Sequence, residues 1–149
     1  MIYQGKAQYP VTEVVLHCGA FAADWHKGKT AQQMRDAVDV MHRNRKPAFK
    51  KIGYHGVFAP DGSFAQGREF TEIGAGVVER NRGVIHLLMV ESQLIEKMGR
   101  FEDFFTEMQR NAVRTKIKSL PGIQWVTGHN DYAKKLCPGF KVQDADWLP

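Results

Sequence analysis

The chain has 149 residues, 43% hydrophobic and 25% charged, which fits one globular domain with a sizeable core and excludes a membrane-spanning or disordered chain. Lysine and arginine outnumber aspartate and glutamate by 21 to 16, a formal charge of +5. Two cysteines are too few for a disulfide framework, and the start MIYQGKAQYP lacks the pattern of a signal peptide, so we expect synthesis in a cytosol.

The first predicted elements are a strand and a helix. VTEVVLH, residues 11–17, is β-branched and ends at a histidine, which indicates a buried strand. A loop follows, and Thr30 with Gln33 resembles the capping box that begins a helix. The predicted helix ends before Pro47, and its apolar face consists of Ala31, Met34, Val38 and Met41.

The middle of the chain predicts strands. KIGYHGVF, then Asp61-Gly62, then SFAQGRE indicate a hairpin. VIHLLMV, residues 84–90, is a nearly continuous apolar run, as expected of a central strand covered on both faces.

The last third predicts a second helix and a last strand. The helix is to end by Pro121, and its apolar face consists of Phe101, Phe104, Phe105, Met108 and Ala112. WVTGH, residues 125–129, reads as a strand whose end carries His129. Together the elements predict one three-layer α/β domain over residues 1–149, with a central mixed β-sheet flanked by helices.

Much of the positive charge lies in two stretches, residues 43–51 and 110–118. They are either solvated helix faces or a surface that attracts a polyanion, such as nucleic acid or a polymer of the bacterial envelope. Basic strands interleaved with aromatic residues, which are typical of RNA-binding proteins, are absent from the sequence.

GHNDYAKKLCPGF, residues 128–140, places His129 and Cys137 close together, and neighbouring lysines favour the thiolate that metals bind. A catalytic zinc needs three protein ligands. His17, at the end of a hydrophobic strand, is the best distant candidate for the third, although it could also be a hydrogen-bonded core histidine. Alternation along a strand would send Cys18 to the opposite face, so it is interpreted as a small core residue.

His26 and His42 lie among polar residues in the sequence, and we expect both to be exposed.

Four segments in order resemble the type-two N-acetylmuramoyl-L-alanine amidases, a family that includes phage lysozyme-type enzymes and peptidoglycan recognition proteins. The similarity covers roughly residues 11–142. The segments are VVLHCGA (14–20), KKIGYHGVFAPDGSFAQGRE (50–69), ERNRGVIHLLMV (79–90) and GHNDYAKKLCPGF (128–140).

The resemblance implies one zinc ion held by His17, His129 and Cys137 in an open groove on one face of a mixed sheet. It also implies that Tyr54 matches the catalytic tyrosine, and that Lys135 matches a lysine of the phage branch. Two neutral imidazoles and one thiolate leave zinc a Lewis acid, able to lower the pKa of water from about 16 to roughly 7. The Lys135 ammonium would stabilise the oxyanion formed at an amide carbonyl, and Tyr54 would orient water or pass a proton.

The implied reaction is hydrolysis of the amide between N-acetylmuramic acid and the L-alanine of the stem peptide in peptidoglycan. Without a separate wall-binding domain, the chain resembles a compact, monomeric phage endolysin that reaches the wall after release from the host cytoplasm. Two alternatives stay open. One is a non-catalytic peptidoglycan-binding protein, although such proteins commonly lose the cysteine ligand that is present here. The other is a regulator that binds nucleic acid or a polymerase.

Two positions depart from the family pattern. Gly76 stands where many relatives have a histidine beside the cleft, and His86 stands where they tend to have glycine in the central strand. Either His86 is hydrogen-bonded inside the sheet, or it reaches the cleft and partly replaces the missing imidazole.

Overall fold

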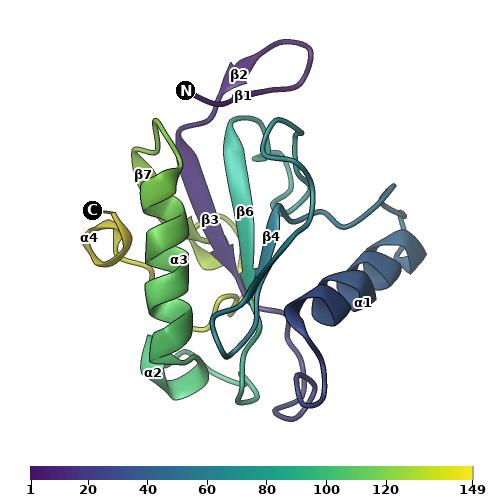
Figure 1. Ribbon diagram of the computed structural model, residues 1–149, viewed down its shortest axis with the longest axis vertical. Coiled ribbons are helices and arrows are strands. Elements are labelled where there is room, and N and C mark those ends of the chain that lie inside the picture. Colours follow the sequence, from purple (N-terminus) through teal and green to yellow (C-terminus); the bar gives the residue numbers. More distant parts are fainter. Residues whose placement is uncertain (149) are drawn as a thin grey trace.

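The computed structural model describes residues 1–148, and its centre is a mixed five-stranded sheet in the order β5-β4-β6-β3-β7 (Figure 1). The strands are β3 (Glu13–His17), β4 (Gly56–Phe58), β5 (Phe64–Gln66), β6 (Val84–Met89) and β7 (Trp125–Gly128). Four of them run parallel, and only β5 is antiparallel to its neighbour β4. The predicted hairpin and the predicted central strand are confirmed.

Strands β3 and β6 lie inside the sheet, and most of their side chains are apolar. Every residue of both strands is buried, as parallel strands require when both faces are covered. Their register pairs Val15 with His86 and His17 with Leu88. His17 and His86 therefore lie on the same face, two residues apart along the paired strands.

One face of the sheet packs on the helices of the C-terminal third. These are α2 (Phe101–Phe104), α3 (Glu107–Ser119) and α4 (Asp144–Trp147). Leu16, Leu87 and Val126 from the sheet share one apolar cluster with Val113 and Trp147 from the helices. This face of the sheet is therefore covered by a mainly apolar layer.

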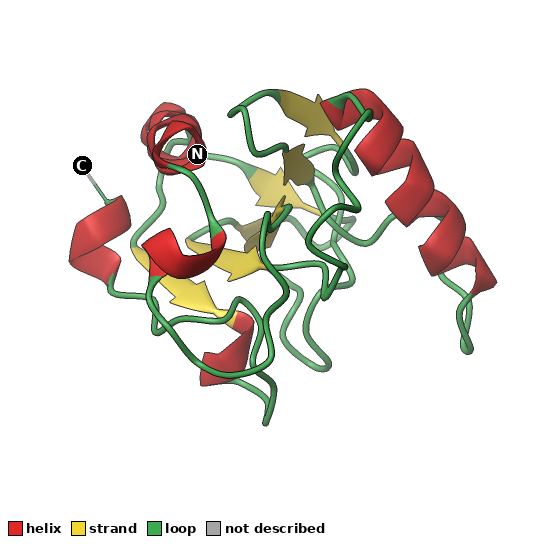
Figure 2. Ribbon diagram, turned by 90° about the horizontal axis from the view of Figure 1, so that it is seen from below, coloured by secondary structure: helices red, strands yellow, loops and turns green. Residues whose placement is uncertain are grey.

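The other face is covered by α1 (Ala31–Asn44) at the β4–β5 end, and by loops elsewhere. Figure 2 shows α1 and α3 on opposite sides of the sheet. Met34 and Val38 of the helix pack with Val57 and Leu88 of the sheet. Thr30 and Gln33 form the predicted capping box at the start of this helix. The predicted α/β class, a mixed sheet flanked by helices, is confirmed.

The helix predicted after residue 100 is two helices. Phe105 and Thr106 interrupt it, and Thr106 caps α3 through its own capping box with Gln109. That second start signal was missed because the phenylalanines continue the apolar spacing across the break. Met108 is consequently 57% exposed, which contradicts its predicted place on the apolar face.

Met41 is also outside the core, at 44% exposure, so α1 buries a shorter stripe than its sequence suggests. A small ribbon of β1 (Tyr3–Gln4) and β2 (Tyr9–Pro10) was not predicted, because strands of two residues carry no periodicity. The helix α4 was missed for the same reason. Among the described residues, no helix has both the length and the apolar character to span a bilayer.

His55, just before β4, is fully buried and held in one neutral form. Its Nδ1 accepts from the His86 backbone N–H at 3.0 Å, and its Nε2 donates to the Glu72 carbonyl at 2.8 Å. Burial lowers the pKa of His55 to about 4, because the charged ring would lose its water and the Nδ1 hydrogen bond.

The protein should lose stability as the pH falls from 7 to 4, in part through His55. The unfolded chain binds a proton near pH 6.5 while the folded chain resists it, so the contribution is complete above 6.5 and lost as the pH passes 4. The difference corresponds to roughly 3 kcal/mol. Urea unfolding of wild type and His55→Leu at several pH values measures it. An unchanged pH dependence in the variant would contradict this assignment.

Candidate active site

Two histidines meet where parallel strands end. His17 is the last residue of β3, and His129 follows directly after β7, which pairs with β3 through Leu16 and Gly128. The ring centroids of His17 and His129 are 5.0 Å apart. His17 is fully buried, whereas His129 is only partly covered.

Cys137 reaches the same point on a loop that folds back on itself. The Asn130 backbone N–H donates to the Cys137 carbonyl at 2.8 Å, and the Asn130 side chain donates to the carbonyls of Leu136 and Phe140. These bonds fix the distance between His129 and Cys137, eight residues apart. The Cys137 Sγ atom lies 3.9 Å from His17 Nδ1.

The donor atoms of His17, His129 and Cys137 all lie within 4.8 Å of one another. Two imidazole nitrogens and one sulfur suit zinc, which prefers such ligands in tetrahedral geometry. The predicted residues are thus brought together in a set that fits a metal ion.

The Cys137 thiol is prepared to bind a metal as thiolate. The side-chain contact with Cys18 lowers its pKa most, the nearby imidazoles of His129 and His17 lower it further, and together they outweigh the burial that would raise it. The Cys18 backbone N–H also donates to Cys137 Sγ at 3.1 Å. The contact between the two thiols, together with burial, raises the pKa of Cys18, so the negative charge belongs to Cys137.

Cys18 was predicted to be a core residue, and it is 7% exposed and packs in the apolar cluster under α3. The strand ends at His17, however, so alternation does not carry Cys18 away from the site. It contributes to the wall of the pocket beside Cys137 without belonging to the set of three donors.

A pocket of about 420 Å³ opens beside two of the three donor residues, whereas the third, His17, is buried behind its wall. His129 and Cys137 line it together with Tyr54 and Lys135, and Ile95 and Leu136 add an apolar edge. Lys135 is exposed, so its ammonium is free to move toward a bound molecule. The structure therefore places Tyr54 and Lys135 at the same pocket as His129 and Cys137.

Tyr54 lies in the segment before β4 rather than in a strand. Its ring packs against His17 at 4.8 Å and His42 at 5.1 Å between centroids. Burial and the nearby Cys137 thiolate raise the pKa of the Tyr54 hydroxyl. The phenol consequently keeps its proton at neutral pH and is a hydrogen-bond donor.

His42 and His26 are half-buried, which contradicts the prediction that both are exposed. His42 Nδ1 accepts from the Gly53 backbone N–H at 2.8 Å, and burial lowers its pKa to about 4. The polar sequence around His42 hid this role, because only the tertiary fold brings residue 53 to the end of α1.

Glu91 is a buried carboxylate that the sequence reading missed. Its two oxygens accept from the backbone N–H groups of Gly19 at 2.9 Å and Phe21 at 3.1 Å. Gly19 and Ala20 line the pocket, so Glu91 fixes the loop that forms this wall. Burial raises the pKa of Glu91 above its usual value.

His86 is fully buried and does not line the pocket, so it does not replace a cleft imidazole. It lies behind His17, with Nδ1 2.9 Å from His17 Nε2. Of the two readings, hydrogen bonding inside the sheet is therefore the one that the structure shows.

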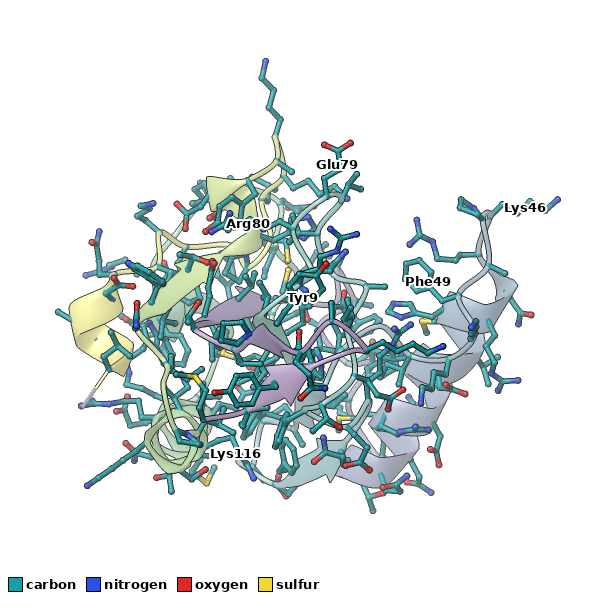
Figure 3. The ribbon with its side chains drawn as sticks, turned by 90° about the horizontal axis from the view of Figure 1, so that it is seen from above. Tyr9, Lys46, Phe49, Glu79, Arg80 and Lys116 are labelled. Atoms are coloured by element: carbon teal, nitrogen blue, oxygen red, sulfur yellow. The ribbon has the colours of Figure 1, made fainter. Side chains whose placement is uncertain are left out.

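Several groups of the two basic stretches have partners. Arg43 pairs with Asp39, Lys51 with Glu72, and Arg110 with Glu102 and Glu107. Lys46 extends away from the body beyond the end of α1 (Figure 3). These contacts agree with solvated faces, and attraction to a polyanion stays a prediction.

No family model matches the chain. The endolysin of Enterobacteria phage K11 is 24% identical over 135 residues, which cover 89% of this chain and 83% of that protein. The endolysin of Escherichia phage T7 is 22% identical over 143 residues, which cover 94% and 88%.

Solved structures share the fold. The N-acetylmuramoyl-L-alanine amidase LysC from Clostridium intestinale URNW has a TM-score of 0.67 and 19% identity, covering 88% of this chain and 78% of that one. Drosophila peptidoglycan recognition protein SD has a TM-score of 0.72 and 17% identity, covering 93% and 79%. The resemblance predicted from four segments is confirmed: the chain is similar in sequence to phage endolysins and shares the fold of amidases and peptidoglycan recognition proteins.

Proposed function

We propose that this protein is a zinc-dependent N-acetylmuramoyl-L-alanine amidase that acts as a phage endolysin. It cleaves the amide between N-acetylmuramic acid and the L-alanine of the stem peptide. The observation that carries the proposal is the set of three donors within 4.8 Å beside a pocket lined by Tyr54 and Lys135. The endolysin relatives and the amidase structures support it.

His17, His129 and Cys137 would hold the zinc ion. When bound, zinc supplies Lewis-acid chemistry, activating water near neutral pH and polarising a carbonyl oxygen. A non-catalytic receptor is the weaker candidate, because a site that only binds peptide has no need of the low-pKa thiol at Cys137. Nothing observed in the structure favours a regulator that binds nucleic acid or a polymerase.

Lys135 and Tyr54 act on the reacting amide. The Lys135 ammonium stabilises the negative charge that develops on the carbonyl oxygen during attack. The Tyr54 hydroxyl, whose pKa is raised, keeps its proton and donates a hydrogen bond to water or substrate. The loop held by Glu91 forms one wall of the pocket, so the substrate contacts a fixed surface there.

The protein reaches its substrate in the cell wall after the protein is released from the host cytoplasm, and it acts as a monomer. The formal charge of +5 favours contact with envelopes that carry anionic polymers.

Purified protein should release stem peptides from peptidoglycan only when zinc is bound. A chelator should abolish release and added zinc should restore it, because the three donor residues contribute to catalysis only by holding the metal. Free amino termini of L-alanine are measured before and after chelation. Release of reducing sugar ends instead would show that a different bond is cut and would contradict the proposal.

Cys137→Ser should lose most of its zinc, whereas Cys18→Ser should keep it. Only Cys137 belongs to the donor set, and only its thiol has a lowered pKa. Zinc content after gel filtration checks this, with the thermal midpoint as a control for folding. Loss of zinc in Cys18→Ser but not in Cys137→Ser would reverse the assignment of the two thiols.

Lys135→Ala should keep zinc and the fold but lose roughly 3 kcal/mol of transition-state stabilisation, the usual effect of removing an oxyanion donor. Tyr54→Phe should likewise bind wall but hydrolyse it more slowly, since it lacks only a hydroxyl. Lys134→Ala, one residue away and outside the pocket lining, is the matched control. Wild-type turnover in both variants with full zinc would refute these two roles while leaving the metal site intact.

A further inference from the structure

Behind His17 the structure contains a buried chain of hydrogen bonds that ends at a surface loop. His17 Nε2 lies 2.9 Å from His86 Nδ1, and His86 Nε2 lies 2.8 Å from Asn81 Oδ1. Both rings are 0% exposed. His86 comes from β6, the strand beside β3, and Asn81 comes from the loop that leads into β6. Neither the lining of the pocket nor the set of three donors explains why these buried hydrogen bonds are present.

The positions of the protons on the two rings follow from the Asn81 end of this series of hydrogen bonds. Asn81 Oδ1 also faces the backbone N–H groups of Gly76 at 2.9 Å and Val77 at 3.1 Å. Two N–H donors identify this atom as the amide oxygen, an acceptor only. His86 Nε2 must therefore carry hydrogen and donate to it.

The same reasoning continues to the metal ligand. A neutral His86 with hydrogen on Nε2 has a lone pair on Nδ1, so it accepts from His17 Nε2. His17 then has its hydrogen on Nε2 and its lone pair on Nδ1. Nδ1 is the atom that faces Cys137 Sγ, at 3.9 Å.

We propose that His86 and Asn81 are positioning residues, which hold His17 in the one tautomer and ring orientation that present the Nδ1 lone pair to the metal. The proposal rests on the metal centre of the proposed function. Neither residue touches substrate or metal. Partners of this kind typically change metal affinity by about 10- to 100-fold.

The surroundings are shaped for the His86 ring. A Cβ atom at Gly76 would lie 2.4 Å from His86 Nδ1, and one at Gly74 would lie 2.9 Å from its Cδ2, so a side chain and the ring cannot share this space. The two departures from the family pattern, glycine at 76 and histidine at 86, therefore depend on each other. The ring at 86 fills the space that a side chain at 76 would need.

The loop that carries Asn81 is itself fixed. Its neighbour Arg80 pairs with the buried Glu13 at 2.8 Å, and the guanidinium lies over the Tyr132 ring at 4.3 Å. Figure 3 shows Glu79 pointing out from the surface, whereas Arg80 lies over the body of the protein. Asn81 consequently has a rigid base from which to orient His86.

The direct test is the tautomer of each histidine in metal-free wild type, read from two-bond couplings between ring nitrogens and protons in the ¹⁵N-labelled protein. His17 and His86 should both carry hydrogen on Nε2. Hydrogen on Nδ1 of His17, or a mixture of the two forms, would overturn the proposal. This measurement needs no variant and no activity.

The second test measures zinc affinity by competition with a chromogenic chelator. His86→Leu should bind zinc about 10- to 100-fold more weakly, and Asn81→Leu should be weakened in the same direction. Asn81→Asp keeps an acceptor for His86 and should restore affinity to near the wild-type value. Gly76→Ala, which displaces the ring, should weaken binding without removing any hydrogen-bonding group.

His55→Leu is the matched control, because His55 is a buried histidine of the same layer that bonds only to backbone groups. It should lose stability but keep zinc affinity. Equal loss of affinity in His55→Leu and His86→Leu would reduce His86 to a structural role and overturn the proposal. Wild-type affinity in His86→Leu would overturn this proposal alone, whereas a wild type that binds no zinc would overturn the proposed function.

Discussion

The parallel pairing of β3 with β6 and β7 is the constraint on which the rest of the site depends. Parallel strands end at the same edge of a sheet, so the carboxyl ends of β3 and β7 deliver His17 and His129 to one point. Neither histidine needs a long loop to reach the other. The third donor, Cys137, then needs only a short loop to reach the two histidines. Asn130 closes this loop, because its backbone N–H and its side chain both donate to backbone carbonyls of the loop.

The two faces of the sheet divide stability from chemistry. One face buries an apolar layer against α2, α3 and α4. The opposite face packs apolar side chains against α1 at the β4–β5 end and buries polar side chains beside them. A buried polar group costs free energy unless it is paired. His17, His55 and His86 are each hydrogen-bonded through their ring nitrogens, and Glu13 accepts from Arg80, Thr127 and Tyr132. The polar layer is therefore a connected structure that leaves the His17 Nδ1 edge available to the site.

The sequence predicted what depends on local pattern, and missed what depends on packing. Strand 84–90 and the start of α1 carry strong local signals, and the structure has both. His17 and His129 could be placed because each ends a predicted strand. The break at Thr106, the burial of His42 and the anchoring of the pocket loop by Glu91 have no local signature. Each depends on a partner at least ten residues away or on a competing signal within an apolar run. The direction in which His86 points belongs to the same class, since it is decided by the space that Gly76 leaves.

Cys18 and Cys137 show how the fold assigns different chemistry to two thiols in contact. Cys18 follows directly after β3 and is enclosed by the apolar cluster, so ionising it would place a charge where little compensates it. Cys137 accepts from the Cys18 backbone N–H and lies beside two imidazoles, and these surroundings lower the pKa of its thiol. A metal ion entering the site consequently finds one thiolate rather than two. With a second thiolate the ligand set would cancel the charge of a divalent ion, and zinc would be a weaker Lewis acid than with one. In the proposed enzyme, the placement of Cys18 just outside the donor set would leave the metal centre with a net positive charge, next to Lys135, where the reaction would build negative charge.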